Sequence, residues 1–160
     1  MTKIDFSVDK EKLEVVMTHV FNAPRDVVWE VYTNPDMIPQ WWGPGNMTTT
    51  VDKMEVKEGG VWRYIQKDEQ GNVNGFHGVY KEVREPEFLS DTFNYEPVGP
   101  GHELTETLRL EEIGEGKTRA VSTSYFNSIE DMEGVMQPGM EEGAAETYDR
   151  FDKLLEKILK

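Results

Sequence analysis

MEEGAAETYDRFDKLLEKIL, residues 140–159, is the segment around which we expect the rest of the chain to fold. Glu141 and Glu142 at its start and Lys157 near its end suit the two poles of a helix dipole. Pro138 is expected as the first helical residue. A helix of nineteen or so residues spans roughly 28 Å, the width of a small domain. Its apolar residues recur every three or four positions, which places them on one helix face: Met140, Ala144, Tyr148, Phe151, Leu154, Leu155, Ile158 and Leu159.

The first turns of this helix carry very small side chains, at Gly143, Ala144 and Ala145. Two interpretations are open. Gly143 can allow the helix to approach a sheet closely, or the missing side-chain volume can leave a cavity there.

Upstream of the helix, the chain is dominated by runs of alternating polar and apolar residues that are typical of strands. Two short helices are expected after the first strand, at 24–34 and 36–40, and a short helix or lid at 127–139. Strands followed by a terminal helix indicate an α+β domain with an antiparallel sheet, here strongly curved around the helix. We expect one domain over residues 1–160, with strands at 13–20, 47–56, 61–67, 73–83, 88–96, 102–113 and 117–126.

The composition limits the class of partner. A formal net charge of −14 argues against nucleic acid and against anionic membrane surfaces, because both bind through Lys and Arg clusters. Without cysteine, the chain can form no disulfide and no thiolate-based site. No export signal or membrane-spanning apolar stretch is present, so we expect a cytoplasmic protein.

Several short motifs are spread from about residue 13 to 159. They are Phe21-Asn22-Ala23-Pro24, Val28-Trp29, Thr33-Asn34-Pro35, Trp41-Trp42-Gly43-Pro44, Glu58-Gly59-Gly60-Val61-Trp62-Arg63-Tyr64, Gly78-Val79-Tyr80, Gly139-Met140-Glu141-Glu142-Gly143 and Tyr148-Asp149-Arg150-Phe151. In their order and spacing, these motifs resemble those of homologues of the activator of heat-shock protein 90 ATPase, within the START-like (SRPBCC) superfamily.

This resemblance implies a helix-grip fold, like that of birch pollen allergens, in which a curved antiparallel sheet grips the C-terminal helix. It also implies a deep apolar cavity that holds a hydrophobic ligand. His19 departs from the family, which commonly has Arg at this position. Any role carried by a permanent charge at that point is therefore in doubt.

Aromatic residues are the main candidates for a cavity wall, although most strand aromatics are ordinary core residues. Methionines suit an adaptable wall, and tyrosine hydroxyls with His77 would supply the polar groups that orient a ligand. The candidate ligand-binding residues are Trp42, Trp62, Tyr64, Phe76, His77, Tyr80, Phe93, Tyr95, Tyr125, Met136, Met140, Ala144 and Tyr148.

Glu106 is a further candidate ligand-binding residue, because period two places it on the same strand face as Leu104, Leu108 and Leu110. Three explanations are open. Glu106 lies where the sheet opens to water, or points into a cavity, or pairs with an arginine such as Arg63, Arg84 or Arg119.

Other kinds of chemistry find no support. His19, His77 and His102 lack the spacing of a metal site, no Gly-rich loop precedes a helix, and no nucleophile elbow occurs. We expect neither a metal nor a cofactor.

The sequence therefore predicts a protein that binds a small hydrophobic molecule and is not an enzyme. One alternative is a polyketide cyclase or dehydratase, for which His77 and Glu106 form the only candidate acid–base pair. The other is a chaperone-associated protein-binding module, which the family name alone suggests.

Overall fold

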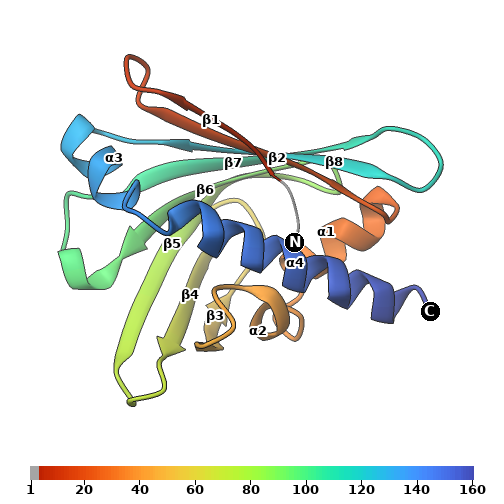
Figure 1. Cartoon of the computed structure of the whole chain (residues 1–160), viewed down its shortest axis with the longest axis horizontal. Helices are drawn as coiled ribbons and strands as arrows, with labels where there is room; N and C mark the ends of the chain where they lie inside the picture. The colour runs from red at the N-terminus through yellow and green to blue at the C-terminus, as the bar shows by residue number, and fades with distance from the viewer. Residues whose placement is uncertain (1–3) are drawn as a thin grey trace.

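An eight-stranded antiparallel sheet curves around the C-terminal helix α4 in the computed structural model, which describes residues 4–160 (Figure 1). The strand order is β1-β2-β8-β7-β6-β5-β4-β3, so the last strand lies beside the second, and β1 and β3 form the two edges of the sheet. The strands are β1 (Asp5–Asp9), β2 (Glu14–Phe21), β3 (Thr48–Met54), β4 (Val61–Lys67), β5 (Val73–Arg84), β6 (Phe88–Tyr95), β7 (Leu104–Glu112) and β8 (Thr118–Tyr125).

Four α-helices complete the fold: α1 (Arg25–Thr33), α2 (Ile38–Trp41), α3 (Ile129–Val135) and α4 (Met140–Ile158), with a 3-10 turn at Glu96–Val98. Helix α4 crosses the curved sheet, and α2 packs against both α4 and β3. Among the described residues, no helix is both long and apolar enough to cross a membrane.

The main core lies where α4 meets β2 and the two short helices. Phe151 is fully buried there, and its ring centre lies 4.4 Å from that of Phe21 and 4.8 Å from those of Tyr32 and Trp41. These contacts fix the C-terminal half of α4 against the sheet.

A second, smaller core lies beside α3. Met132 is buried there with Val15, Leu104 and Phe126. Ser128 caps the helix by accepting a hydrogen bond from the backbone N–H of Asp131. The segment expected as a short helix or lid is thus a packed helix.

The predicted α+β fold, a curved antiparallel sheet around a long C-terminal helix, is confirmed. One strand was missing from the prediction: β1 pairs with β2, with Phe6 opposite Met17. It escapes sequence analysis because three of its five residues are polar and it lies at the sheet edge.

Details of the helix ends also differ from the prediction. Helix α4 begins at Met140. The preceding residue, Gly139, has a left-handed φ of 92° and lies outside the helix, so Pro138 is not the first helical residue. Ile158 and Leu159 extend the apolar face beyond the sheet and are exposed.

Candidate functional site

A pocket of about 330 Å³ lies between the sheet and the first half of α4. Its position agrees with the cavity interpretation of the small residues in that helix, although only Ala144 of the three lines it. The pocket is lined by Met17, Tyr32, Ile38, Trp41, Trp42, Gly43, Tyr64, Tyr80, Leu89, Asp91, Glu106, Thr107, Leu108, Ser122, Ala144, Thr147 and Tyr148.

Two rows of cross-strand neighbours make the floor of the pocket. We call the first the polar row: Tyr80 of β5 pairs with Asp91 of β6, which pairs with Glu106 of β7. Residues directly opposite one another on antiparallel strands have Cβ atoms about 4.5–5.5 Å apart, so the two carboxyl groups are immediate neighbours.

The second row is mainly apolar, and we call it the apolar row. Leu89 of β6 pairs with Leu108 of β7, which pairs with Ser122 of β8, which pairs with Met17 of β2. The register therefore gives the floor a polar half and an apolar half.

Helix α4 and the loop after α2 close the pocket over this floor. Trp42 and Gly43 of the loop line it, and Arg150 of α4 donates a hydrogen bond to the carbonyl oxygen of Gly43 at 2.7 Å. Glu146 of α4 accepts a hydrogen bond from the backbone N–H of Gly45. Two motifs that are about a hundred residues apart in the chain thus meet, and α4 fixes the loop.

The loop can lie this close only because Gly43 has no side chain. Its φ is 86°, and a Cβ atom there would lie 2.1 Å from the side-chain nitrogen of Gln66. Any other residue would be strained in this conformation and would displace Gln66.

The two carboxyl groups of the polar row are poorly solvated, and this favours their protonated forms. Burial raises the pKa of Glu106 to about 7. The pKa of Asp91 is raised well above its ordinary value, first by burial and then by the neighbouring charge of Glu106. The accessible part of Glu106 faces the pocket, and no residue from 4 to 160 donates a hydrogen bond to its carboxyl group or forms an ion pair with it.

Tyrosines and one tryptophan surround these carboxyl groups. Burial, followed by neighbouring Tyr80 and Asp91, raises the pKa of Tyr64, and burial raises the pKa of Tyr148 to about 12. Both phenols are therefore protonated at neutral pH. The buried indole N–H of Trp62 points toward Asp91 without reaching full hydrogen-bond geometry, and its donation toward the carboxyl group lowers the pKa of Asp91, against the effect of burial.

Six of the predicted ligand-binding residues line this pocket: Trp42, Tyr64, Tyr80, Glu106, Ala144 and Tyr148. Four others pack behind its wall as an aromatic layer: Trp62, Phe76, Phe93 and Tyr95. Their rings fill space between strands, as strand aromatics ordinarily do.

Three further predicted residues lie elsewhere. Met136 and Met140 pack on the second core beside α3, and Tyr125 is 38% exposed at the end of β8. The prediction placed them in the wall because it assumed that the pocket extends to the start of α4. Ala144, one turn later, is the first α4 residue to line it.

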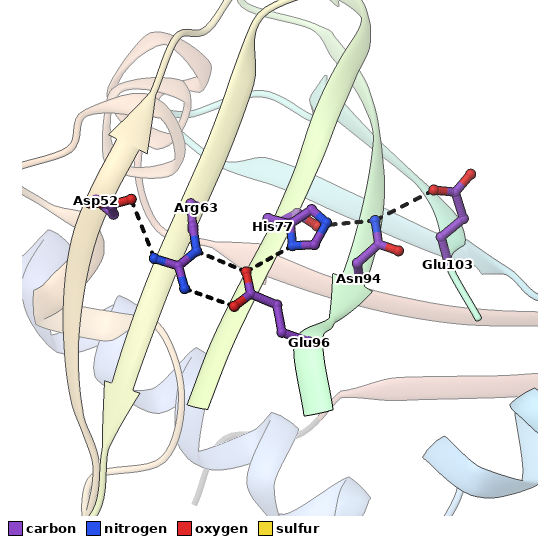
Figure 2. Close-up of polar contacts among 6 residues, drawn as sticks. All are labelled: Asp52, Arg63, His77, Asn94, Glu96 and Glu103. Carbon is purple, nitrogen blue, oxygen red and sulfur yellow. Dashed lines mark hydrogen bonds and ion pairs between the residues drawn. The ribbon is translucent and has the colours of Figure 1, made fainter. Parts of the chain in front are cut away.

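His77 lies on the outer face of the sheet and cannot join the pocket (Figure 2). Its Nδ1 is 2.8 Å from Oε2 of Glu96, which also binds Arg63 through two hydrogen bonds of 2.8 Å. Hydrogen bonds from Arg63, followed by that from His77, lower the pKa of Glu96 to about 2. The expected His77–Glu106 acid–base pair is therefore wrong, because the two residues lie on opposite faces.

The arginine explanation of Glu106 is also wrong, because Arg63, Arg84 and Arg119 form no ion pair with it in the described part of the chain. Arg63 binds Glu96 and Asp52, and Arg84 binds Glu82 beside it in β5. Asp91, the cross-strand neighbour of Glu106, was not among the predicted site residues. The same period-two rule would have found it, because Asp91 alternates on β6 with Leu89 and Phe93.

The other two histidines each face a carboxylate. Nε2 of His19 is 3.1 Å from both carboxylate oxygens of Asp152 on α4, and Nδ1 of His102 is 2.7 Å from Asp131. Within residues 4–160, no group of three or more His, Asp or Glu side chains could hold a metal ion. His19 thus joins β2 to α4, whether or not it carries a charge.

Comparison with known proteins points to one family. The profile described as Activator of Hsp90 ATPase homolog 1-like protein matches residues 22–156. The structure of protein Ms6760 from Mycobacterium smegmatis is similar, with 27% identity, a TM-score of 0.84 and coverage of 98% of this chain and 99% of that one. A protein from Arthrobacter aurescens has 26% identity, a TM-score of 0.86 and coverage of 96% and 91%. No curated protein matches the sequence.

Proposed function

Because the chain belongs to the Activator of Hsp90 ATPase homolog 1-like family, we propose that it binds a small hydrophobic molecule in the pocket between the sheet and α4. The resemblance to START-like proteins, many of which hold apolar ligands between sheet and helix, supports this proposal. The family alone does not identify the ligand, since one fold can serve many functions.

The observation that carries the proposal is the pocket itself. Its volume of about 330 Å³ falls at the lower end of the range for small-molecule sites, about 300–1,000 Å³. Leu89, Leu108 and Met17 offer an apolar surface on one side, while few polar groups converge on the other. A mainly apolar cavity with a small number of placed polar groups is the usual form of such sites.

A thermal-shift screen with and without a filled pocket tests the proposal. A ligand that binds only the native state at a hundredfold excess over Kd stabilises it by about 2.7 kcal/mol. For a domain of this size the melting temperature should rise by roughly 5–10 °C. Fatty acids, sterols, flavonoids, aromatic polyketides and hydrophobic amines make up the screen.

The blocking variant is Ala144→Trp, which places an indole in the pocket, with Ala144→Leu as a milder second variant. The control is Glu142→Trp, which adds the same indole to an exposed position of α4. Compounds that bind the pocket should shift the native protein and the control but not the blocked variants. If no compound shifts the native protein, or if Ala144→Leu leaves every shift unchanged, the pocket is not the ligand site.

A further inference from the structure

We propose that the ligand is an organic cation, a hydrophobic amine whose protonated nitrogen lies between the carboxyl groups of Asp91 and Glu106. Its apolar part lies over the apolar row of the floor. This inference rests on the proposed function and names the chemical class of the ligand.

The arrangement of the polar row is the first reason. Asp91 and Glu106 are directly opposite each other on β6 and β7, and both line the pocket. No described arginine, lysine or histidine pairs with Glu106, although nearby outer-face carboxylates such as Glu96 do have such partners. The pocket therefore contains carboxyl groups whose natural counter-charge the chain does not provide.

The rest of the lining agrees with a cation. The titratable groups facing the carboxyl pair are phenols on four elements: Tyr32 of α1, Tyr64 of β4, Tyr80 of β5 and Tyr148 of α4. None of the lining residues is basic. Aromatic rings around a protonated or quaternary nitrogen stabilise it through their negative faces, and this contribution grows when water is excluded.

The same features disfavour the competing classes. A fatty acid would bring a third carboxyl group against Asp91 and Glu106, where burial and the neighbouring acids disfavour its ionised form and no basic lining residue can pair with it. A neutral carbonyl or hydroxyl compound can bind only a protonated carboxyl group, and it gains nothing from the net charge of −14 that attracts cations.

The pH dependence of binding distinguishes a cationic ligand from a neutral one. Burial favours protonation of the pair, with the pKa of Glu106 at about 7, so a cation must displace a proton to bind. Affinity should therefore rise with pH by up to about tenfold per unit below this value and level off above it. A neutral ligand that accepts a hydrogen bond from the protonated carboxyl group should show the opposite trend.

Three probes with one hydrocarbon body test the inference: 4-phenylbutylamine, 4-phenylbutan-1-ol and 4-phenylbutyrate. Isothermal titration calorimetry at pH 5.5, 6.5, 7.5 and 8.5 measures each affinity, and two buffers with different ionisation enthalpies measure the protons released. The amine should bind at least about tenfold more tightly than the alcohol at pH 7.5, the acid should bind more weakly than the alcohol, and only the amine should release protons.

Two variants of the carboxyl pair and one control complete the experiment. Glu106→Gln and Asp91→Asn should each weaken amine binding by at least about tenfold and change alcohol binding by less than about threefold. Glu111→Gln removes the same charge from an exposed position of β7 and should leave all three affinities unchanged. Circular dichroism verifies that each variant is folded.

Equal or tighter binding of the alcohol or the acid would overturn the inference, and so would an amine affinity unaffected by Glu106→Gln. In both cases the pocket would remain a hydrophobic ligand site. If none of the three probes binds, the inference is also wrong, whereas the broader screen with the Ala144 variants judges the proposed function separately.

Discussion

Ionisation of the Glu106 carboxyl group destabilises the folded state, because the group is buried. Its pKa rises from 4.5 to about 7 on folding, so the folded protein binds the proton more tightly than the unfolded chain does. The penalty is absent below about pH 4.5, grows between pH 4.5 and 7, and is constant above. The free energy of unfolding should therefore fall across this window.

We expect Glu106→Gln to remove most of this dependence. The variant and the native protein should have similar free energies of unfolding at pH 4.5, and at pH 8 the variant should be more stable by about 2–3 kcal/mol. Urea unfolding at the two pH values measures the difference. Glu111→Gln, exposed on the same strand, should show no such change, and a constant difference between native and Glu106→Gln would mean that the carboxyl group is well solvated.

Gly143 gives a second test at a single residue. The close-approach interpretation of Gly143 was wrong: apart from its chain neighbours and the backbone of its own helix, no described atom lies within 4 Å of where its Cβ would be. The pocket lies beside Ala144, and Gly143 itself does not line it. Gly143→Ala should therefore stabilise the protein by about 0.5–1 kcal/mol through helix propensity alone.

Chemical denaturation measures that gain in the free energy of unfolding. Any pocket ligand should raise the melting temperature of Gly143→Ala as much as it raises that of the native protein. A loss of stability would show that the helix packs more closely at Gly143 than its open surroundings indicate. Gly75 is the contrasting control, because a Cβ there would lie 2.1 Å from the Glu96 carboxylate, so Gly75→Ala should destabilise.

Phe151 is the residue through which helix α4 contributes most to the stability of the fold. Its ring is fully buried against rings from β2, α1 and α2. Phe151→Ala should lower the free energy of unfolding by about 3–5 kcal/mol, because it removes both apolar burial and packing. Ile158→Ala, two turns further along the same helix face but 40% exposed, should cost less than about 1 kcal/mol. Equal costs would mean that the buried face of α4 is wrongly assigned.

The contact of α4 with the loop after α2 depends on Arg150. Its guanidinium binds carbonyl oxygens of Gly43 at 2.7 Å and Pro44 at 3.4 Å. Arg150→Met keeps an unbranched apolar side chain but removes the guanidinium, which leaves these acceptors without a donor, so we expect a loss of about 1–3 kcal/mol. Amide hydrogen exchange should also become faster at residues 43–47.

The control for Arg150→Met is Lys153→Met, which makes the same change of charge on α4. Lys153 is exposed and pairs only at the surface with Asp149, so its replacement should change stability by less than about 1 kcal/mol. If both variants lose the same stability, charge on the helix matters and the loop contacts do not.

Helices and strands could be predicted from the sequence wherever the repeat of apolar residues was long and regular. The apolar face of α4 and the strands with turn residues between them were predictable, because helix and strand periods differ clearly. β1 was not predictable, since only Phe6 and Val8 mark it and an edge strand needs little apolar surface.

Across the whole molecule, the pocket depends on sheet curvature, which no local pattern encodes. The register shifts between Val51 and Lys53 and between Tyr80 and Glu82, and such irregularities bend a sheet. The bend and the pairing together decide that Tyr64 and Tyr80 line the pocket while Trp62 and Phe93 pack behind it. A list of aromatic residues could not make this distinction, because all four face inward.

The acidic surface gives the last prediction, which concerns the molecule as a whole. With 31 acidic and 17 basic residues, repulsion between charges opposes the compact state. Raising the salt concentration from about 0.01 to 0.15 M shortens the screening length from roughly 30 to 8 Å. Salt also weakens exposed attractive pairs such as His77–Glu96, but each of these contributes little at the surface.

The net effect should be stabilising, by on the order of 1 kcal/mol or about 2–4 °C in melting temperature. Sodium chloride and potassium chloride should act alike, because screening does not distinguish between them. Replacing Glu58 and Glu69, both exposed in turns, with Lys makes the net charge four units less negative and should reduce the salt effect. A melting temperature that is flat over this range, or equally salt-dependent in the double variant, would mean that the acidic residues are too dispersed to act together.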